Sequence, residues 1–497
     1  MDILSADARC APPPWSDDAP QRLDLQQGLG PDHLARRIEQ AVLCLDLSPF
    51  LQVYGRTGSL PYRPDLLLRA VLYEVQRGQH RPAQWHRDAR ESQPLRWLLR
   101  GCQPSRSVWY AFRDRIAPFL DEWHRQVLAR AAADGLTPAC RGALDGTLVA
   151  ANASRHRLVS DAALGKRQQQ LALALADDER GQLPKDPPAW MARRPLGRQQ
   201  QQQRLERART QMDQRRAYQQ GKRSSKRKAA AAVVVSLSDP EAAVGRDKEK
   251  VYRPLYNVQV VDDLDSPLVL GYEVFARPND AGLLGAMQAR VEQAVGHRLR
   301  VLLVDGSYTG GADLAAAQAA GVTVYGPLPA EESSPKQIPK REFVWLSDER
   351  TYQCPQGHRL ELEKVTRQKR STPEEVVLQQ YRCPAEHCRS CPRREGCTPN
   401  PQRGRSISRS EHEELIEALR ERMKTAEAKA LYRLRSQTVE LVNADWKEHR
   451  QLRRFSGRGL RRARTQVGLM VMSHNLVTLR SEEKKAATAR APTQTAA

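Results

Sequence analysis

The spacing of apolar residues changes along the chain and predicts two kinds of structure. Residues 32–135 repeat apolar side chains at helical spacing, as in PDLLLRAVLYEVQRG, with Gly or Pro at the breaks. From residue 233 onward, short β-branched runs such as LYNVQVVDD, LVLGYEVF and LRVLLVDGSY are bounded by Asp, Gly and Pro. GLLGAMQARVEQAVG and GADLAAAQAAG have helical spacing again. With the run around Leu144, the pattern predicts a helical part followed by a mixed α/β layer whose sheet has about five or six strands.

Residues 161–232 follow neither pattern. They contain the pure glutamine run Gln199 to Gln203 and the basic stretches KRQQQ and GKRSSKRKAAAA. A packed core is not expected from this composition, which predicts a partly helical, solvated insertion with a disordered basic end at Lys222 to Lys228. This segment either grips phosphates without reading bases or serves as a charged linker.

The net charge of the chain narrows the class of binding partner that we expect. The 497 residues include 80 Lys plus Arg against 58 Asp plus Glu, a formal net charge of +22 with a pI near 9.9. Such an excess indicates a polyanion, first of all nucleic acid, because each neutralised phosphate releases a counterion. The chain has no run of about 18 apolar residues, and MDILSADARCAPPPWSDDAP lacks the basic and apolar segments of a secretory signal. We therefore expect a cytoplasmic protein with no membrane partner.

One stretch of the helical part has the order of a DNA-binding motif. PLRWLLRGCQPSRSVWYAFRDRI reads as a helix, a turn with Gly, and a second helix opened by Pro104 and Ser105. An ordinary helical hairpin would have the same pattern. Arg106, Arg113 and Arg115 favour contact with DNA.

Two carboxylates occur in matching contexts. RGALDGTLVAANAS and RVLLVDGSY each place an apolar run before Asp-Gly, at Asp145 and at Asp305. In an open α/β sheet, functional groups gather where strands end, so the two acids would form half of a metal site if their strands are neighbours. The alternative is that each Asp-Gly pair is only a hairpin turn.

A third acid lies in the C-terminal part, in a stretch of helical composition. Glu440 has Arg435 five residues before it and Lys447 seven residues after it, almost two turns away on the same face. Glu440 would complete a cation site while Arg435 and Lys447 meet the phosphate backbone. Alternatively it is an ordinary surface residue, and Asp445 and Glu448 are nearby competitors for the role.

These segments together resemble a known family. LDGTLVAANAS, YNVQVVDD, LLVDGSY and RSQTVELVNADWKEHR, in this order, resemble the DDE transposases of bacterial insertion sequences, over about residues 35–480. In that family an RNase H-like domain supplies Asp, Asp and Glu, and the matching residues are Asp145, Asp305 and Glu440.

The resemblance extends to the surroundings of the last acid. In related elements this acid often sits in a pattern of Tyr, Arg, Glu and Lys. Glu440 and Lys447 keep the final spacing, whereas Arg435 is one position too early and Tyr432 is also displaced.

The resemblance implies an activity, cofactors and partners. Three carboxylates would hold two Mg²⁺ or Mn²⁺ ions about 4 Å apart, for attack of water or a DNA 3′-hydroxyl on phosphorus. The protein would bind the inverted-repeat ends of its element as a nucleoid-associated homodimer, then cut and join double-stranded DNA. The alternatives are an RNase H-like nuclease that does not join DNA and a transposase-derived DNA-binding protein without catalysis.

The cysteines indicate a second kind of metal site. Of the nine cysteines, four are scattered and five lie between residues 354 and 397, which suits a local metal site better than a disulfide framework. Similar cysteine-bearing insertions occur in related transposases. The alternative is a set of reduced structural cysteines. The preferred Zn²⁺ ligands are Cys354, Cys388, Cys391 and Cys397, with Cys383, His358 and His387 as substitutes.

Other polar residues allow two interpretations of their role. Asn152, Asn257 and Gln259 are either structural or in contact with DNA, and the first is favoured. The arginines beside the cysteines, Arg389, Arg393 and Arg394, are further candidates for DNA contact.

We therefore expect an α+β, mixed α/β fold in which a helical N-terminal DNA-binding domain precedes an RNase H-like catalytic domain with two insertions. The expected segments are a disordered N-terminus (1–31), the helical domain (32–135), the first part of the RNase H-like domain (136–160), the basic Gln-rich insertion (161–232), the continued RNase H-like domain (233–345), the cysteine-rich zinc-binding insertion (346–405), the C-terminal helical part of the catalytic domain (406–480) and a disordered tail (481–497).

Overall fold

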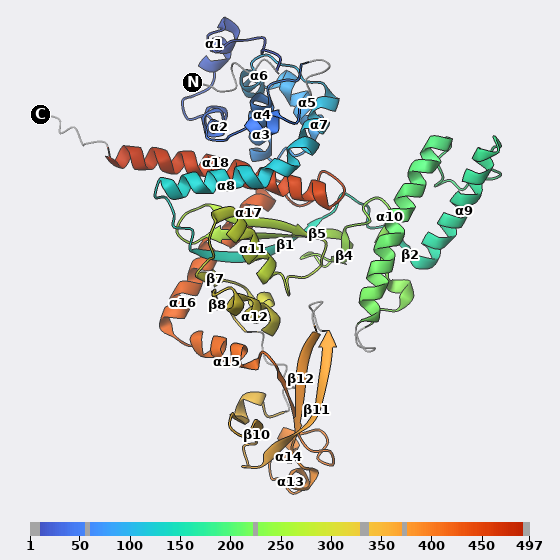
Figure 1. The fold of residues 1–497 in the computed structure, drawn as a ribbon, viewed down its shortest axis with the longest axis vertical. Helices are drawn as coiled ribbons and strands as arrows, with labels where there is room; N and C mark the ends of the chain where they lie inside the picture. Colours follow the sequence, from blue (N-terminus) through green and yellow to red (C-terminus); the bar gives the residue numbers. More distant parts are fainter. Residues whose placement is uncertain (1–9, 55–59, 222–226, 329–336, 370–374, 491–497) are drawn as a thin grey trace, which may run out of the picture.

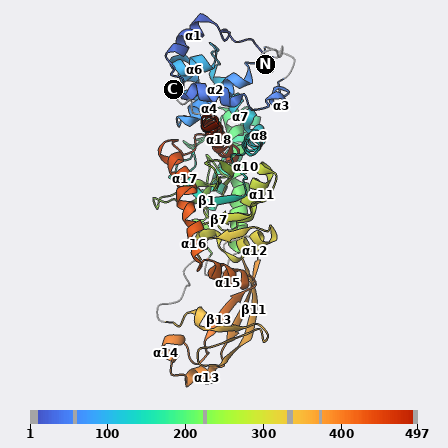
Figure 2. The same cartoon turned by 90° about the vertical axis from the view of Figure 1, so that its left-hand side faces the viewer.

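The computed structural model describes residues 10–54, 60–221, 227–328, 337–369 and 375–490. Figures 1 and 2 show an elongated molecule with the N-terminal helices at one end, the main sheet in the middle and the cysteine-bearing strands at the other end. A pair of long helices projects beside the sheet. Mixed α/β structure is confirmed.

The N-terminal part consists of helices packed around α4, of which nearly every residue is buried. Four aromatic side chains, Phe50, Trp85, Trp109 and Trp123, are at most 2% exposed and fill its core. The long C-terminal helix α18 (Leu460–Arg490) packs against α2, α4 and α8 and also against the main sheet, so it joins the two layers. The N-terminal helices are α1 (Pro20–Gln27), α2 (Leu34–Val42), α3 (Ser48–Leu51), α4 (Pro64–Gln76), α5 (Pro82–Glu91), α6 (Gln93–Leu98), α7 (Arg106–Ile116), the 3₁₀ turn η1 (Ala117–Phe119) and α8 (Leu120–Ala133).

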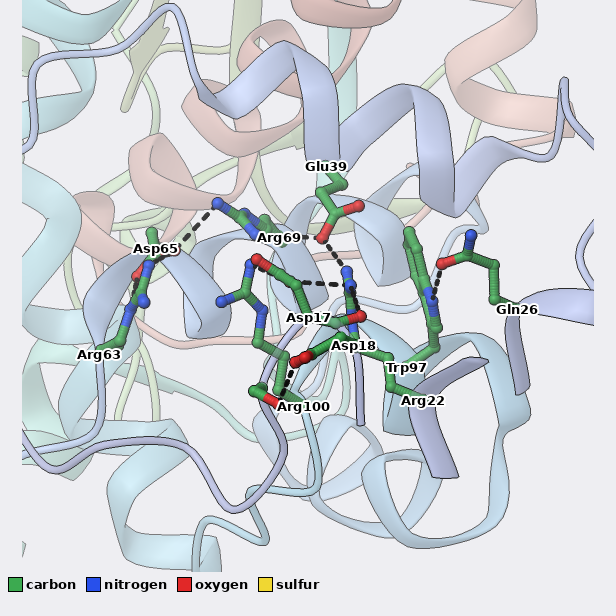
Figure 3. Close-up of polar contacts among 11 residues, drawn as sticks. Asp17, Asp18, Arg22, Gln26, Glu39, Arg63, Asp65, Arg69, Trp97 and Arg100 are labelled. Atoms are coloured by element: carbon green, nitrogen blue, oxygen red, sulfur yellow. Dashed lines mark hydrogen bonds and ion pairs between the residues drawn. The ribbon is translucent and has the colours of Figure 1, made fainter. Parts of the chain in front are cut away.

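The expected disorder of residues 1–31 is wrong for residues 10–31, and residues 1–9 lie outside the described residues. Arg22, 5% exposed, pairs with Asp17 at 2.8 Å and with Glu39 at 2.6 Å, and its guanidinium lies over Trp97. Figure 3 shows these side chains pointing toward one another, with Arg100 on the other side of Asp17. A composition rich in Pro, Asp and Ala predicted disorder because it does not reveal ion pairs with distant residues.

The main sheet has six strands, as expected, in the order β4-β5-β1-β7-β8, with β6 also paired to β5. β5 is antiparallel to its neighbours, and β1, β7 and β8 are parallel. Gly271 faces Val291 of α11 and the next residue, Tyr272, approaches Gly468 of α18, so these helices cover opposite faces. The elements are β1 (Arg141–Ala150), β4 (Ala243–Arg246), β5 (Tyr252–Asp263), β6 (Val269–Phe275), α11 (Leu284–Val295), β7 (Val301–Leu303), η4 (Gly306–Tyr308), α12 (Gly311–Ala319) and β8 (Thr323–Tyr325).

The basic insertion is a helical hairpin with a small core of its own, so the expectation that it lacks a packed core is wrong. Leu164, Leu171, Leu205 and Met212 are buried between its helices. Such widely spaced apolar residues suffice because two helices bury them against each other. Residues 222–226 of the expected disordered basic end lie outside the described residues. The hairpin comprises β2 (Leu158–Ser160), α9 (Asp161–Glu179), α10 (Pro195–Gln220), η3 (Ala230–Ala232) and β3 (Val234–Ser236).

The cysteine-bearing part is a five-stranded sheet in the order β13-β12-β11-β10-β9, with two short helices. Further helical segments lead from it back to the main sheet (Figure 1). The elements are η5 (Lys340–Glu342), β9 (Val344–Leu346), β10 (Thr351–Gln353), β11 (Arg359–Lys369), β12 (Glu375–Arg382), α13 (Ala385–Arg389), α14 (Arg394–Cys397), β13 (Ser406–Ser410), α15 (Glu413–Arg422), α16 (Ala426–Arg433), η6 (Leu434–Gln437) and α17 (Val439–Glu448).

The expected disorder of the tail from residue 481 is wrong as far as Arg490, where α18 ends, and residues 491–497 lie outside the described residues. Within the last turns, Lys485 pairs with Glu482 at 2.7 Å, and Lys484 pairs with Asp32 at 2.6 Å. These ion pairs help to stabilise the last turns of α18. In the described part of the chain, no helix is both long and apolar enough to cross a membrane.

The contact between the N-terminal segment and the end of α6 yields a stability prediction. Gly101 has φ +80°, and a Cβ added there would lie 2.7 Å from the Trp15 ring, whereas Gly135 has φ +72° with open space around it. We expect Gly135→Ala to lower the free energy of unfolding by about 1–2 kcal/mol from backbone strain alone. Gly101→Ala should lower it further because Trp15 must also move. Urea denaturation of both variants checks this, and equal losses would contradict the packing of Trp15 on Gly101.

Candidate active site

Asp145 lies within β1 and not at its end. β1 continues through Asp145 and Gly146, with Asp145 opposite Val260 of β5, so this Asp-Gly pair is not a hairpin turn. The strand that ends here is β7, the other neighbour of β1, because β7 pairs with β1 only over Arg141–Ala143. The expectation of a strand end is thus wrong for β1, although Asp145 does lie where a neighbouring strand stops.

Asp305 comes to the same place from the other strand. In the parallel register Ala143 stands beside Leu303, and Asp145 and Asp305 each lie two residues further on. Asp305 begins η4, where its Oδ1 accepts hydrogen bonds from the Ser307 backbone N at 2.7 Å and from the Ser307 Oγ at 2.5 Å. The strands of the two acids are therefore neighbours, and the charge of Asp305 acts on Asp145.

Glu440 reaches the site from the first turn of α17. The Arg435 guanidinium donates to the Glu440 Oε1 at 2.7 Å and to the Asp145 Oδ1 at 2.8 Å. Arg435 is 7% exposed, whereas about half of the Glu440 side chain is exposed. One buried cation therefore holds two acids that are far apart in the sequence.

The early position of Arg435 is compensated by the local backbone. Residues 434–437 form the 3₁₀ turn η6, and Thr438 breaks the helix with φ −119° and ψ −97° before α17 begins. The break reorients the chain between Arg435 and Glu440. Tyr432, at the end of α16, also belongs to this neighbourhood, because the charges of Arg435 and Asp305 act on its hydroxyl.

Sequence reasoning missed Asn443, which donates from Nδ2 to the Asp145 Oδ2 at 2.8 Å. Asn443 lies three residues after Glu440, so helical spacing would have placed both on one face of α17. With Arg435 on one carboxylate oxygen and Asn443 on the other, the orientation of Asp145 is determined from both sides.

Burial and the neighbouring charges shift the pKa of Asp145 in opposite directions. Burial raises the pKa of Asp145, the Arg435 guanidinium lowers it, and the charge of Asp305 raises it again. Lys447, on the same helix as Glu440, has its pKa lowered by burial and by the charge of Lys248, and the charge of Asp145 raises it. Lys248, in the turn between β4 and β5, was not a candidate from the sequence.

Polar side chains of β5 belong to a network that reaches Asp305, because the Ser307 hydroxyl contacts both Asp280 and Asp305. Asn257 and Gln259 donate to the Asp280 Oδ1 at 2.7 and 2.8 Å, and the Tyr308 hydroxyl donates to Gln259. A Cβ on Gly146 would lie 2.1 Å from the Gln259 Nε2 and 2.4 Å from the Asp280 Oδ1, so the glycine leaves room for these hydrogen bonds. The contacts support the structural reading of Asn257 and Gln259. Asn152 likewise donates to the Ser456 carbonyl at 2.7 Å.

The DNA-contact candidates of the helical part differ in exposure. Helices α6 and α7 have the expected helix, turn and helix order. Arg106 and Arg115 are exposed, over the rings of Tyr110 and Tyr54. Arg113 is 6% exposed and donates to Asp114 at 2.8 Å, so the structure does not support it as a DNA contact.

The cysteines gather at one end of the molecule. Cys388 is 8% exposed, and its thiol shares a hydrogen bond with the buried thiol of Cys383. Burial raises the pKa of Cys383, and the neighbouring sulfur of Cys388 raises it further. The rings of His358 and His387 stack at 4.2 Å. A small cavity is lined by Cys354, Cys383, Cys388, Cys391, Cys397, His358 and His387.

Neither group is arranged as a finished metal site. Among the residues that the structure describes, no three His, Cys, Asp or Glu side chains stand where they would hold a metal ion as they are. At the carboxylates, the Arg435 guanidinium lies between Asp145 and Glu440. The donor types nevertheless fit two metals, because carboxylate oxygens suit Mg²⁺ and thiolates suit Zn²⁺.

Comparison with known proteins agrees with the resemblance seen in the sequence. Residues 353–480 match the family model described as a transposase DDE domain. This segment holds the five clustered cysteines and Glu440. Asp145 and Asp305 come earlier in the chain and lie outside it. No curated protein matches the chain. The match supports a DDE-type transposase, and the prediction of that family is confirmed.

A further acid near the site has an unusual environment. Asp262 of β5 is opposite Ala143, on the same face of the sheet as Asp145, and is 3% exposed. Neither oxygen of its carboxyl has a hydrogen-bond partner among the described residues. Burial raises its pKa well above the usual value, and the charges of Asp145 and Asp263 add to the shift.

This environment predicts a pH dependence of stability. Above about pH 4 the unfolded chain loses the Asp262 proton while the folded chain keeps it, so stability falls as pH rises toward the folded pKa. In Asp262→Asn this loss is absent. We expect the variant to gain on the wild type by up to about 1.4 kcal/mol per pH unit in that window.

Urea denaturation at several pH values between about 5 and 8 measures this gain. Asp24→Asn, at an exposed position, controls for removal of one carboxyl group. A stability difference between Asp262→Asn and the wild type that stays constant with pH would contradict the prediction.

Proposed function

We propose that this protein binds the inverted-repeat ends of an insertion sequence and catalyses metal-dependent DNA cleavage and strand transfer through Asp145, Asp305 and Glu440. One observation carries the proposal. Asp145 of β1 and Glu440 of α17 share the guanidinium of Arg435, and Asp305 follows the strand beside Asp145. Residues that serve only as turns or as a helix surface would have no reason to converge from three elements.

The three acids would hold Mg²⁺ or Mn²⁺, which supplies activation of the nucleophile and stabilisation of the leaving oxygen. Asn443 orients the Asp145 carboxylate, and Ser307 orients that of Asp305. Water, or later a DNA 3′-hydroxyl, forms a bond to phosphorus while the opposite phosphorus–oxygen bond breaks, and the departing oxygen leaves as a 3′-hydroxyl.

The basic side chains at the site have a different task. Arg435 and Lys447 lie beside carboxylates, at the position where a scissile phosphate would enter. Guanidinium groups bind phosphate oxygens through paired hydrogen bonds, so Arg435 can exchange a carboxylate partner for the phosphate. This supports the role in backbone contact expected for both residues.

We propose that most of residues 136–160, 233–345 and 406–480 forms one RNase H-like catalytic domain, interrupted by the basic hairpin and the cysteine-bearing sheet. The strands at the borders of these ranges, β2, β3, β9 and β13, belong to the insertions. The main sheet, α11, α17 and the start of α18 share one hydrophobic core, whereas each insertion has a separate cluster. The function also requires double-stranded DNA of the nucleoid as partner. Since two element ends must be paired, we propose a homodimer.

Cleavage tests the proposal directly. Purified protein is incubated with Mg²⁺ or Mn²⁺ and a supercoiled plasmid that carries the DNA flanking the gene. We expect cuts at the repeat boundaries and joined products, and a loss of at least about a hundredfold in Asp305→Asn and Glu440→Gln, which lack a charge that stabilises the transition state.

Glu448→Gln is the matched control, because Glu448 lies on the same helix but pairs with Arg453 at the surface. It should cleave like the wild type. Cleavage without joined products would indicate a nuclease, and binding without cleavage would indicate a silent DNA-binding protein. Full activity of Glu440→Gln would mean that a different acid completes the site.

We also propose a structural Zn²⁺ at the cysteines. The thiols of Cys383 and Cys388 already contact each other, and four of the clustered sulfurs would suffice once they turn toward one ion. The sequence indicates Cys383 only as a substitute ligand. Because its buried thiol contacts Cys388, it is as strong a candidate zinc ligand as Cys354 and Cys391.

Zinc content provides the measurement. We expect about one Zn²⁺ per chain, lower thermal stability after chelation, and loss of zinc in Cys388→Ser. Cys102→Ser, at a buried cysteine of the helical part, should retain the metal. Wild-type protein without zinc that is unaffected by chelators would support reduced structural cysteines instead.

A further inference from the structure

The segment between α17 and α18 runs along the end of β1. The Phe455 backbone N donates to the Ala150 carbonyl at 2.9 Å, and the Ala150 N donates to the Arg453 carbonyl at 3.3 Å. Ala150 lies five residues beyond Asp145, a span of about 17 Å along the strand, or about half a helical turn of duplex DNA. The segment therefore contacts β1 beyond Asp145, at the end of the strand.

Among the described residues, three exposed arginines of this region have backbone carbonyls as their hydrogen-bond partners. Arg454 donates to the Ala153 carbonyl at 3.4 Å, Arg458 to the Asn152 carbonyl at 3.2 Å and Arg461 to the Asp114 carbonyl at 2.9 Å. In the part of the chain that the structure describes, none of the three has a carboxylate partner in an ion pair. Their positive charge is therefore uncompensated.

Other arginines of the same region differ in this respect. Arg450 pairs with Asp445 at 3.1 Å, and Arg462 pairs with Asp114 at 3.0 Å. Carboxylates are therefore present nearby, yet they leave the other three arginines unneutralised.

These arginines connect the two proposed DNA-contacting parts. At the near end the charge of Asp145 acts on Lys447, and at the far end Arg461 donates to the Asp114 carbonyl in the last turn of α7. Helix α7 carries the exposed Arg106 at its other end. Positive charge thus extends from the acids to the helical part.

We infer that Arg454, Arg458 and Arg461 form a strip that binds the phosphate backbone of duplex DNA between the catalytic acids and the helical part. This inference rests on the proposed function and assigns a path to its DNA. A regular row of phosphates fits exposed guanidinium groups that lack carboxylate partners, because phosphate contact releases counterions without breaking an internal ion pair. The strip positions DNA and reads no sequence.

The competing explanation is that the arginines only fasten the segment to neighbouring carbonyl groups. Two triple variants separate the explanations. Gln at all three positions keeps a side-chain donor for the carbonyl but removes the charge, whereas Lys keeps the charge but loses the guanidinium geometry. The control is Arg125→Gln, Arg298→Gln and Arg359→Gln, which makes the same change in net charge at exposed arginines elsewhere.

The experiment measures binding of the full-length protein to a random-sequence DNA duplex by fluorescence anisotropy, over a series of salt concentrations and without divalent metal. For Arg454→Gln, Arg458→Gln and Arg461→Gln together, we expect the slope of log affinity against log salt to fall by about 0.9 per arginine, or about 2.7 in total. The Lys triple variant and the control should keep the wild-type slope.

An unchanged slope in the Gln triple variant would overturn the inference, and so would an equal loss in the Lys triple variant or in the control. Cleavage of element ends is scored in a separate reaction. A wild-type protein that binds through the strip but cuts no DNA would retain this inference and lose the proposed function.

Discussion

The ion pairs of Arg435 are the interaction on which the candidate site depends. Two carboxylates brought together in a partly buried place repel each other, and an arginine between them offsets that repulsion. Arg435 does so while bonded to Asp145 and Glu440 at once, and Asn443 satisfies the remaining oxygen of Asp145. The same requirement for positive charge makes the acids suited to divalent cations and to a phosphate that arrives with them. The fold around the site provides this arrangement by placing α17 against β1.

Helix α18 gives that arrangement its support. It packs against the sheet on one side and against α2, α4 and α8 on the other, so the N-terminal helices and the sheet share a single hydrophobic core. Its first turn is fixed by Glu241, which accepts a hydrogen bond from the Leu460 backbone N at 2.6 Å. The segment with the exposed arginines lies between this anchored helix and α17. A partner bound to α7 and a phosphate at Asp145 would therefore contact a continuous, well-packed body.

The two insertions show how differently small cores can be built. The basic hairpin relies on a few leucines and on buried ion pairs such as that of Arg198 with Asp178. The cysteine-bearing sheet packs Tyr352, Tyr381 and Trp345 against one another. Neither cluster is large. A bound Zn²⁺ would add stability to the cysteine-bearing sheet.

The sequence by itself determined the helical part, the strands around the acids and the chemical types at the site, because periodicity, β-branched runs and carboxylate spacing are local signals. It named Asp145, Asp305 and Glu440 and gave the strand number of the main sheet. Only the tertiary structure decided that Asp145 lies inside its strand and that residues 10–31 are ordered. It also decided that Arg435 bridges two acids and that Asn443 donates to one of them, Asp145. These facts depend on β-strand register, on a helix break at Thr438 and on ion pairs between distant residues, none of which leaves a periodic pattern in the chain.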